Sequence, residues 1–228
     1  MSCVLVIEDE QAIANIISFN LKREGYDVVC AYDGVEGLKE ALSDKADLIL
    51  LDVMLPGIDG FEILKRVREK SAVPIIMVTA REEERDKIMG LDNGADDYVT
   101  KPFSVRELMS RIKANMRRSG KRAEEPADSR EKYGPFELDR ALQQISKDGE
   151  PLELTQREYD LLCYFFASPS KVVSREELME KVWGYEYVYG DLRAVDVAMR
   201  RLREKTESDP ANPQYIMTRR GGGYYLQI

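Results

Sequence analysis

The 228-residue sequence contains no histidine. This absence excludes the usual Ser/His/Asp and Cys/His nucleophile systems, and it excludes zinc or iron sites that need histidine ligands. It also means that the chain cannot form a phosphohistidine of its own. Any chemistry must therefore use carboxylates, hydroxyls, lysine and a hard metal ion.

Cysteine is scarce, and long apolar runs are missing. Cys3, Cys30 and Cys163 are odd in number and far apart, which predicts neither a zinc site nor a disulfide framework. No apolar run approaches the roughly 20 residues that span a bilayer, and the N-terminal segment MSCVLVIEDE soon reaches acidic residues. We therefore expect no secretory signal, no membrane anchor and a location in the cytoplasm.

Length and charge bound the remaining possibilities. A chain of 228 residues with 43% hydrophobic residues can form two domains, each with its own core. The formal net charge of −8 argues against a nucleic-acid partner for the molecule as a whole. Binding depends on local patches, however, so the net charge does not decide the partner.

The first part of the chain, residues 1–118, alternates short β-rich runs with amphipathic segments. The expected strands are Val4–Ile7, Val28–Ala31, Leu48–Val53, Ile75–Val78 and Asp97–Thr100, and the expected helices include Ala12–Glu24 and Val105–Arg117. This alternation predicts an α/β domain with a doubly wound, five-stranded parallel sheet. In such sheets, functional sites form beyond the carboxyl ends of the strands.

A change of composition separates the two parts. Residues 119–131, SGKRAEEPADSRE, are dense in charge and small side chains and are predicted to form a linker. Residues 132–228 begin with short β runs and continue with two helix starts marked by capping boxes, Thr155-x-x-Glu158 and Ser174-x-x-Glu177. A third helix over Leu192–Thr206 and a glycine-rich hairpin complete the pattern of a winged helix-turn-helix domain.

Four polar residues follow the expected strands at one edge of the sheet. Glu8 and Asp9 end the first strand, Asp52 ends the third and Thr79 ends the fourth. Three carboxylates this close together repel one another, and a hard divalent cation relieves the repulsion most simply. Ligands that are all oxygen favour Mg²⁺ over zinc. The sequence therefore predicts a magnesium site at this edge.

Lys101 ends the last strand and directly precedes Pro102. If one carboxylate accepted a phosphoryl group, the metal ion, the Lys101 ammonium and the Thr79 hydroxyl could share its oxygens. Lys101 would then be the counter-charge to a phosphoryl group on Asp52, and a cis bond to Pro102 would hold it there. Each residue alone also fits a loop acid, a helix cap or a solvated strand end. The order of all of them along the chain is far more specific.

Several stretches carry a resemblance to a known family. VLVIEDE, LILLDVMLPGIDG, IIMVTA and GADDYVTKPF resemble the receiver domain of bacterial two-component response regulators, over about residues 2–118. LTQREYDLL, VWGYEY, VDVAMRRLREK and YIMTRRGGGYYL resemble the winged-helix effector of the OmpR/PhoB family. VWGYEY and RRGGGYYL are also similar to the branch of cell-wall regulators called WalR or VicR. The resemblance implies a bacterial transcription regulator with a flavodoxin-like receiver.

For the receiver, the resemblance implies a role for each residue of the acidic edge. The implied roles are the phosphoacceptor at Asp52, a Mg²⁺ site at Glu8, Asp9, Asp52 and the Met54 carbonyl, and phosphoryl-contact or switch functions at Thr79, Tyr98 and Lys101. A separate sensor histidine kinase would supply the phosphoryl group. Its docking surface is expected on the helix of Ile13, Ile17 and Asn20.

The resemblance also implies a homodimer and a contact with RNA polymerase. Reciprocal ion pairs between two phosphorylated receivers would form the dimer: Lys87 with Glu107, Asp97 with Arg111, and Asp96 with Arg118. Solvated surface charges are the alternative reading of these residues. RNA polymerase would meet the loop between Gly184 and Asp191.

Two other functions are compatible with parts of the pattern. An aspartate-nucleophile phosphatase resembling the haloacid dehalogenase superfamily also uses Asp, Mg²⁺, Thr and Lys, but it needs a second aspartate where this chain has Met54. A DNA-binding protein that does not depend on phosphorylation would have a degenerate receiver, yet no acidic-pocket residue is missing. We therefore expect a regulator and not an enzyme.

The helix Leu192–Thr206 is the expected DNA reader. At 100° per residue, one side carries Leu192, Val195, Met199 and Leu202, and the opposite side carries Arg193, Val197, Arg200, Arg201 and Glu204. Arginines can meet guanine edges and phosphates, and Val197 can meet a thymine methyl group. An ordinary amphipathic helix with a solvated basic face is the alternative.

Other contacts with double-stranded DNA are expected around this helix. Arg203 lies near the apolar side and could be structural, whereas Thr218 and Arg220 belong to the hairpin that would reach the minor groove. Ala194 and Ala198 depart from the family's usual polar residues, which leaves base preference open there. Dimers of the family bind direct repeats, so half-sites about one helical turn apart are expected.

Overall fold

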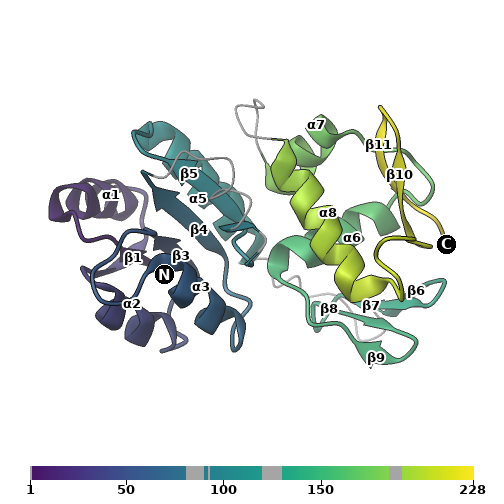
Figure 1. The fold of residues 1–228 in the computed structure, drawn as a ribbon, viewed down its shortest axis with the longest axis horizontal. Helices are drawn as coiled ribbons and strands as arrows, with labels where there is room; N and C mark the ends of the chain where they lie inside the picture. Colours follow the sequence, from purple (N-terminus) through teal and green to yellow (C-terminus); the bar gives the residue numbers. More distant parts are fainter. Residues whose placement is uncertain (1, 81–89, 92, 120–129, 185–191) are drawn as a thin grey trace. The chain divides into compact units, whose positions relative to one another are not determined.

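The structure is a computed structural model that describes residues 2–80, 90–91, 93–119, 130–184 and 192–228, with only the backbone for residues 117–119. The chain divides into two compact units, Met1–Ser119 and Gly120–Ile228. Figure 1 labels the elements of each unit. All three cysteines are free, as predicted.

The first unit is built on a five-stranded parallel sheet. Its strands are β1 Cys3–Ile7, β2 Asp27–Ala31, β3 Leu48–Leu51, β4 Ile75–Thr79 and β5 Asp97–Thr100. They lie in the order β2-β1-β3-β4-β5, so the chain winds in both directions from β1. The predicted doubly wound α/β fold is confirmed, with β3 shorter and β4 longer by one or two residues than the sequence pattern indicates.

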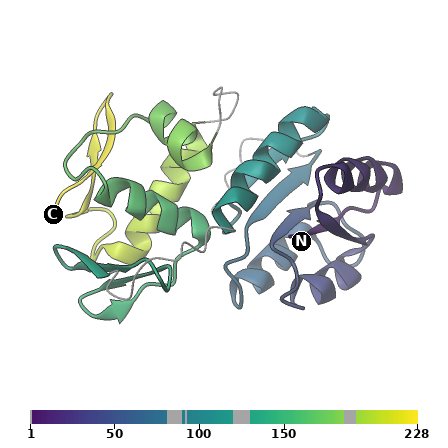
Figure 2. The same cartoon turned by 180° about the vertical axis from the view of Figure 1, so that it is seen from behind.

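Helices cover both faces of this sheet. They are α1 Gln11–Arg23, α2 Gly34–Ala41, α3 Gly60–Arg68 and α5 Val105–Ser119. Because strand side chains alternate, Val4 and Val6 pack with α1 and α5, whereas Leu5 and Ile7 pack with α2 and α3. Figures 1 and 2 show these two helix pairs on opposite sides of the sheet.

The loops at the carboxyl edge of the sheet are fixed by backbone contacts. Asp59 caps α3, since its carboxylate accepts a hydrogen bond from the Glu62 amide at 2.9 Å. The next residue, Gly60, donates its amide to the Val53 carbonyl at 2.9 Å. A Cβ atom on Gly60 would lie 2.1 Å from the Asp52 carbonyl oxygen, so only glycine lets α3 start this close to the end of β3.

The second unit combines a four-stranded antiparallel sheet, helices and a hairpin. The sheet consists of β6 Arg130–Tyr133, β7 Phe136–Asp139, β8 Gln144–Lys147 and β9 Glu150–Pro151, and the hairpin of β10 Ile216–Arg219 and β11 Gly223–Leu226. The helices are α6 Gln156–Phe166, α7 Arg175–Leu178, which continues as the π-helical turn η1 Met179–Trp183, and α8 Arg193–Thr206. The predicted winged-helix pattern is confirmed, although β6 starts within residues 119–131.

The helices of this unit start at the predicted caps. The capping box of α6 is confirmed, since the Thr155 amide donates to the Glu158 carboxylate at 2.8 Å and the Thr155 hydroxyl accepts from the Glu158 amide. The Ser174 hydroxyl accepts from the Glu177 amide at 3.1 Å. The Glu177 carboxylate instead accepts from the Tyr164 hydroxyl and the Lys171 ammonium. These caps fix where α6 and α7 begin around a core that includes Trp183.

Candidate phosphoacceptor site and nucleic-acid interface

Three carboxylates converge at the carboxyl edge of the parallel sheet. Glu8 follows β1 and Asp52 follows β3, and both are buried, whereas Asp9 is exposed. The ligand oxygens of Glu8, Asp9 and Asp52 all lie within 4.8 Å of one another. The sheet therefore brings together the three acids that the sequence places at strand ends.

Lys101 lies between two of these acids. Its ammonium Nζ is 2.6 Å from Asp52 Oδ2 and 2.7 Å from Glu8 Oε1, and it is 3.7 Å from Glu10 Oε1. The predicted cis Lys101–Pro102 bond is confirmed, and the Lys101 amide donates to the Thr79 carbonyl at 2.8 Å. The contact with Glu10 was not predicted, because nothing in the spacing of an exposed loop acid indicates it.

The pocket has more negative than positive charge. Burial, together with the charge of Asp52, raises the pKa of Glu8 to about 7, although the hydrogen bond from Lys101 opposes this shift. Burial alone would lower the pKa of Lys101, but its hydrogen bonds to Asp52 and Glu8 raise it. Lys101 is therefore charged at neutral pH. One ammonium faces three acids, of which Glu8 is only partly ionised at neutral pH, and a divalent cation would favour the ionised form of all three.

The backbone at Met54, two residues after Asp52, shows how an ion could be held. Asp52 Oδ1 accepts a hydrogen bond from the Met54 amide at 3.0 Å, and the Asp52 amide donates to the Ile7 carbonyl at 2.9 Å. Met54 is 59% exposed, and its backbone amide is the group that contacts Asp52. A set of oxygen ligands with exposed Asp9 at its rim suits Mg²⁺, which keeps several of its waters.

The predicted switch residues lie on the two neighbouring strands. Thr79 is the last residue of β4 and is fully buried, and Tyr98 of β5 pairs in register with Met77. The Tyr98 ring lies against Gly90, where a Cβ atom would be 3.3 Å from two of its ring atoms. Thr79 thus lies at the acidic edge and Tyr98 packs beside it on the α3 side of the sheet.

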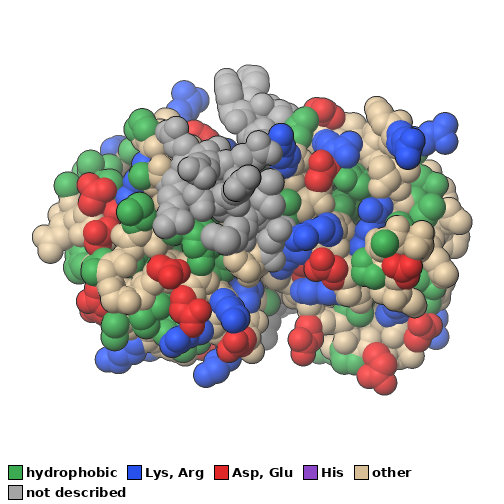
Figure 3. Space-filling view, in the orientation of Figure 1, with side chains coloured by type: hydrophobic (Ala, Val, Ile, Leu, Met, Phe, Trp, Pro, Cys, Tyr) green, Lys and Arg blue, Asp and Glu red, His purple; other side chains and the backbone are tan. Residues whose placement is uncertain are grey.

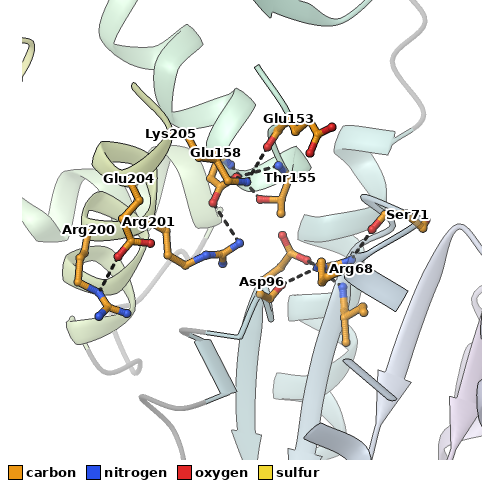
Figure 4. A network of polar contacts seen from close by, with 12 residues as sticks. Arg68, Ser71, Asp96, Glu153, Thr155, Glu158, Arg200, Arg201, Glu204 and Lys205 are labelled. Atoms are coloured by element: carbon orange, nitrogen blue, oxygen red, sulfur yellow. Dashed lines mark hydrogen bonds and ion pairs between the residues drawn. The ribbon is translucent and has the colours of Figure 1, made fainter. Parts of the chain in front are cut away.

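Several residues of the predicted dimer ion pairs also have partners within one chain. Arg111 Nη1 lies 3.0 Å from Asp97 Oδ1, and Arg111 Nη2 lies 2.7 Å from Glu107 Oε1. Asp96 is buried and binds Arg68 Nη2 and the Ile75 amide at 2.8 and 2.9 Å (Figure 4). The Asp96 carboxylate is therefore already engaged within its own chain. Lys87 and the Arg118 side chain lie outside the described residues.

The predicted DNA-reading face of α8 is partly wrong. Arg193 and Arg200 are exposed as predicted, and Arg200 lies 4.0 Å from Glu204 on the same face. Arg201, however, turns to α6 and pairs with the buried Glu158 carboxylate at 3.0 Å, where Lys205 also binds at 2.6 Å (Figure 4). Val197 is only 9% exposed. The exposed face of α8 is therefore narrower than a simple amphipathic pattern indicates, and Glu158 of α6 accounts for the position of Arg201.

The residues predicted to contact DNA from the wing and the end of α8 are of two kinds: some make contacts within the unit and others are exposed. Arg203 donates to the Ile216 carbonyl and, at 2.7 Å, to the Thr218 hydroxyl, so both predicted DNA contacts are engaged with each other. Arg219 and Arg220 at the hairpin tip are exposed. On the face shown in Figure 3, Lys and Arg side chains are interspersed with acids over both units. The exposed basic residues, and not the net charge, therefore define the candidate interface.

The helix on which a kinase is expected to dock is α1, and the residues named for this surface differ in exposure. Ile17 of α1 is buried in the core, since its side chain packs against the sheet. Ile16 and Phe19, which the prediction did not name, are 51% and 63% exposed. The apolar surface of α1 is therefore one position away from the prediction.

Comparison with known proteins places these sites in a family. Residues 4–113 match the response regulator receiver domain, and residues 149–226 match the C-terminal domain of transcriptional regulatory proteins. The structure of a mutant form of RitR is similar, with 30% sequence identity to this chain and a TM-score of 0.77. The match covers 100% of this chain and 99% of the RitR chain. The chain belongs to the OmpR/PhoB family of response regulators. Another similar structure is the response regulator DrrB, a Thermotoga maritima OmpR/PhoB homologue, which is 29% identical over 99% of both chains with a TM-score of 0.53.

Membership in the OmpR/PhoB family identifies a two-component transcription regulator with a receiver and a DNA-binding domain. The Francisella response regulator 1452 receiver domain is 37% identical over 52% of this chain and 99% of its own, with a TM-score of 0.50. Both matched domain types belong to DNA-binding regulators and generally not to enzymes. Among the described helices, none has the length and apolar character to span a membrane. The finer branch, WalR or VicR, stays a prediction.

Proposed function

We propose that Asp52 accepts a phosphoryl group from a sensor histidine kinase and that this modification controls DNA binding by the second unit. The observation that carries the proposal is the position of Lys101, whose ammonium lies within 2.7 Å of both Glu8 and Asp52. A buried lysine in this place neutralises the acids now, and it can neutralise phosphoryl oxygens after transfer.

The residues of the pocket fit this chemistry step by step. An Asp52 carboxylate oxygen attacks phosphorus while the bond from phosphorus to the kinase imidazole breaks, and the imidazole leaves with those electrons. Bound Mg²⁺, held by Glu8, Asp9, Asp52 and the Met54 carbonyl, would supply positive charge to the phosphoryl oxygens. Lys101 would exchange Asp52 for a phosphoryl oxygen, and the Thr79 hydroxyl would donate to another.

Phosphorylation by acetyl phosphate tests this proposal directly. Incubation with acetyl phosphate and Mg²⁺ should give a stable, stoichiometric phosphoryl group on the protein. Continuous hydrolysis would instead favour an aspartate-nucleophile phosphatase, for which the side chain of Met54 offers no acid or base. No modification at all would favour a DNA-binding protein that works without phosphorylation.

We further propose that α8 enters a major groove and the β10–β11 hairpin reaches the minor groove of direct-repeat DNA. Arg193 and Arg200 are the exposed arginines of α8, and Arg220 lies at the wing tip. Arg201 and Arg203 act from within the unit, because Glu158 and the wing backbone engage them. RNA polymerase stays a predicted partner, and its expected loop, residues 185–191, lies outside the described residues.

Arg200→Ala and Arg193→Ala should have different effects on DNA binding. Loss of a base contact at Arg200 should cost about 1–3 kcal/mol on the selected site and relax its sequence preference. Loss of a phosphate contact at Arg193, near the helix start, should weaken all sequences alike and reduce the salt slope by about one. Titrations of selected and random duplexes at several salt concentrations measure both effects. Parental binding by both variants in every titration would mean that α8 does not read DNA.

Dimerisation of the phosphorylated receiver is proposed through the face of α5 that carries Glu107. Glu107 is half-exposed, with 39% of its side chain accessible, and could exchange Arg111 of its own chain for Lys87 of a second copy. Glu107→Lys should therefore keep the phosphorylated protein monomeric in light scattering. Lys113→Glu is the control, because Lys113 pairs with Glu24 of α1 on another side of α5. A dimer of unchanged stability in Glu107→Lys would exclude this face.

A kinase is expected to dock on the corrected surface of α1, beside the acidic pocket. Ile16 and Phe19 form its exposed apolar part, and the Arg23 guanidinium lies 5.8 Å from the centre of the Phe19 ring. This surface combines an apolar patch with a positive charge. It belongs to the helix that directly follows the acidic residues Glu8 and Asp9 in the chain. It supports the docking proposal without identifying the kinase.

A further inference from the structure

We propose that Tyr224, Arg175 and Asp196 form a clasp that fixes the wing hairpin to α8, so that both elements approach DNA as one body. Tyr224 belongs to β11, Asp196 to α8 and Arg175 to the first turn of α7. The inference rests on the proposed DNA binding by α8 and the wing. It assigns positioning roles to three residues for which the sequence pattern predicted none.

The clasp consists of three polar contacts around one carboxylate oxygen. The Tyr224 hydroxyl donates to Asp196 Oδ1 at 2.6 Å, and Arg175 Nε donates to the same oxygen at 2.6 Å. Arg175 Nη2 lies 3.2 Å from the Tyr224 hydroxyl, which closes the triangle. Each of the three elements thus holds the other two.

The Tyr224 ring also contacts positively charged side chains. The Arg175 guanidinium lies 4.9 Å from the ring centre, and the Arg203 guanidinium of α8 lies 5.8 Å from it. Tyr224 is only 5% exposed. Burial, together with the hydrogen bond to Asp196, raises the pKa of Tyr224 to about 12, so the hydroxyl keeps its proton and remains a donor.

Two further sets of hydrogen bonds join α8 to the hairpin, and together with the clasp they are spread along the helix. Near the end of α8, the Glu207 carboxylate accepts hydrogen bonds from the Tyr215 and Ile216 amides at 3.0 and 2.8 Å. Arg203, four residues earlier, binds the Ile216 carbonyl and the Thr218 hydroxyl. The clasp at Asp196 extends these ties to the start of α8, where Arg193 is exposed.

The backbone attachment of the wing does not depend on the Tyr224 hydroxyl. Val173 and Tyr224 exchange backbone hydrogen bonds of 2.8 and 3.0 Å. Gly223 packs so closely that a Cβ atom would lie 1.9 Å from the Val173 carbonyl oxygen. Removal of the hydroxyl alone should therefore leave the hairpin in place and loosen only its orientation to α8.

A rigid connection has a measurable consequence for DNA contacts. If α8 and the wing move as one body, a lost contact at Arg200 weakens the contact of Arg220 as well. The two losses then combine to less than their product. Without the clasp, only the ties of Arg203 and Glu207 near the end of α8 remain, so the wing can adjust more freely to the DNA and the losses should come close to multiplying. This coupling is a readout that a role in folding alone would not change.

The test is a double-mutant cycle in the full chain, measured by titration of a duplex selected from random DNA. In the parent, Arg200→Ala with Arg220→Ala should lose less affinity than the product of the single losses, by about five- to tenfold. In a Tyr224→Phe background this difference should fall to within about twofold. Tyr225→Phe, which removes a hydroxyl from the next residue of β11, should keep the parental difference.

The outcomes separate the clasp from the DNA-binding proposal. If neither arginine variant changes binding in any background, the proposed DNA contacts are wrong. If both arginine variants weaken binding but Tyr224→Phe keeps the parental coupling, the clasp is wrong. A folded Tyr224→Phe protein, shown by unchanged far- and near-UV circular dichroism, is required for either reading. If that variant unfolds, Asp196→Ala replaces it, since it removes the oxygen that accepts from both Arg175 and Tyr224, and it should lower the coupling in the same way.

Discussion

Asp52→Asn should accept no phosphoryl group from acetyl phosphate or from a kinase. The carboxamide oxygen is not a nucleophile at neutral pH, and the proposal assigns the two other acids of the cluster, Glu8 and Asp9, to the metal ion. Asparagine has the shape of aspartate, and its carbonyl can still accept from the Met54 amide and from Lys101. We therefore expect a folded protein that carries no label in intact-mass measurements.

The control for this variant is Asp59→Asn, in the loop that begins α3. Asp59 caps α3 through the Glu62 amide, and asparagine is as good a cap as aspartate. Asp59→Asn should therefore be labelled like the parent. Full labelling of Asp52→Asn under the same conditions would show that the phosphoacceptor is another residue.

Gly60→Ala should destabilise the receiver and slow its phosphorylation together. The new Cβ would lie 2.1 Å from the Asp52 carbonyl oxygen and 2.8 Å from the Val53 Cα, both backbone atoms that cannot rotate away. Either α3 or the end of β3 must move, which should cost about 3 kcal/mol of the free energy of unfolding. Because Asp52 sits at that strand end, labelling by acetyl phosphate should also slow.

Gly25→Ala separates this clash from a general effect of alanine. Gly25 has a positive φ of 86° but no atom within 4 Å of the added Cβ, so its cost is confined to backbone strain, about 1 kcal/mol. Denaturant unfolding followed by circular dichroism gives both free energies. Equal losses in the two variants, with parental labelling in Gly60→Ala, would mean that the contact with Asp52 does not matter.

The sheet and the acidic pocket were predictable because they depend on the order of strands along the chain and on the pattern of apolar residues within each strand. The run Leu48–Leu51 is apolar throughout, as expected for a strand covered on both faces, and Asp52 follows it directly. Parallel strands bring their carboxyl ends to one edge, so the meeting of Glu8, Asp52 and Lys101 follows from topology alone. The bounds of the strands differ by one or two residues, as pattern arguments allow.

Two of the differences concern charged residues whose partners lie far away in the sequence. Helical periodicity placed Arg201 beside Arg200 on the surface, yet Glu158 of α6 draws it inward. Asp96 was predicted as a surface acid, but it is buried and accepts a hydrogen bond from Arg68, 28 residues earlier. Period and spacing describe which side of a helix or strand a residue occupies. They do not describe which distant charge will neutralise it when that side meets another element.

The wing clasp was invisible for the same reason. Arg175, Asp196 and Tyr224 lie on three elements and follow no common spacing in the chain, and each alone suits an ordinary helix end or strand. Only the packing of α7, α8 and β11 brings them together.

The central claim is that phosphorylation of Asp52 controls DNA binding by the second unit. The most direct measurement is the affinity of the full chain for a duplex selected from random DNA, before and after treatment with acetyl phosphate and Mg²⁺. The account predicts tighter binding after treatment for the parent and no gain for Asp52→Asn. Equal affinity of the parent in both states, at full labelling, would contradict it, and so would an equal gain in Asp52→Asn.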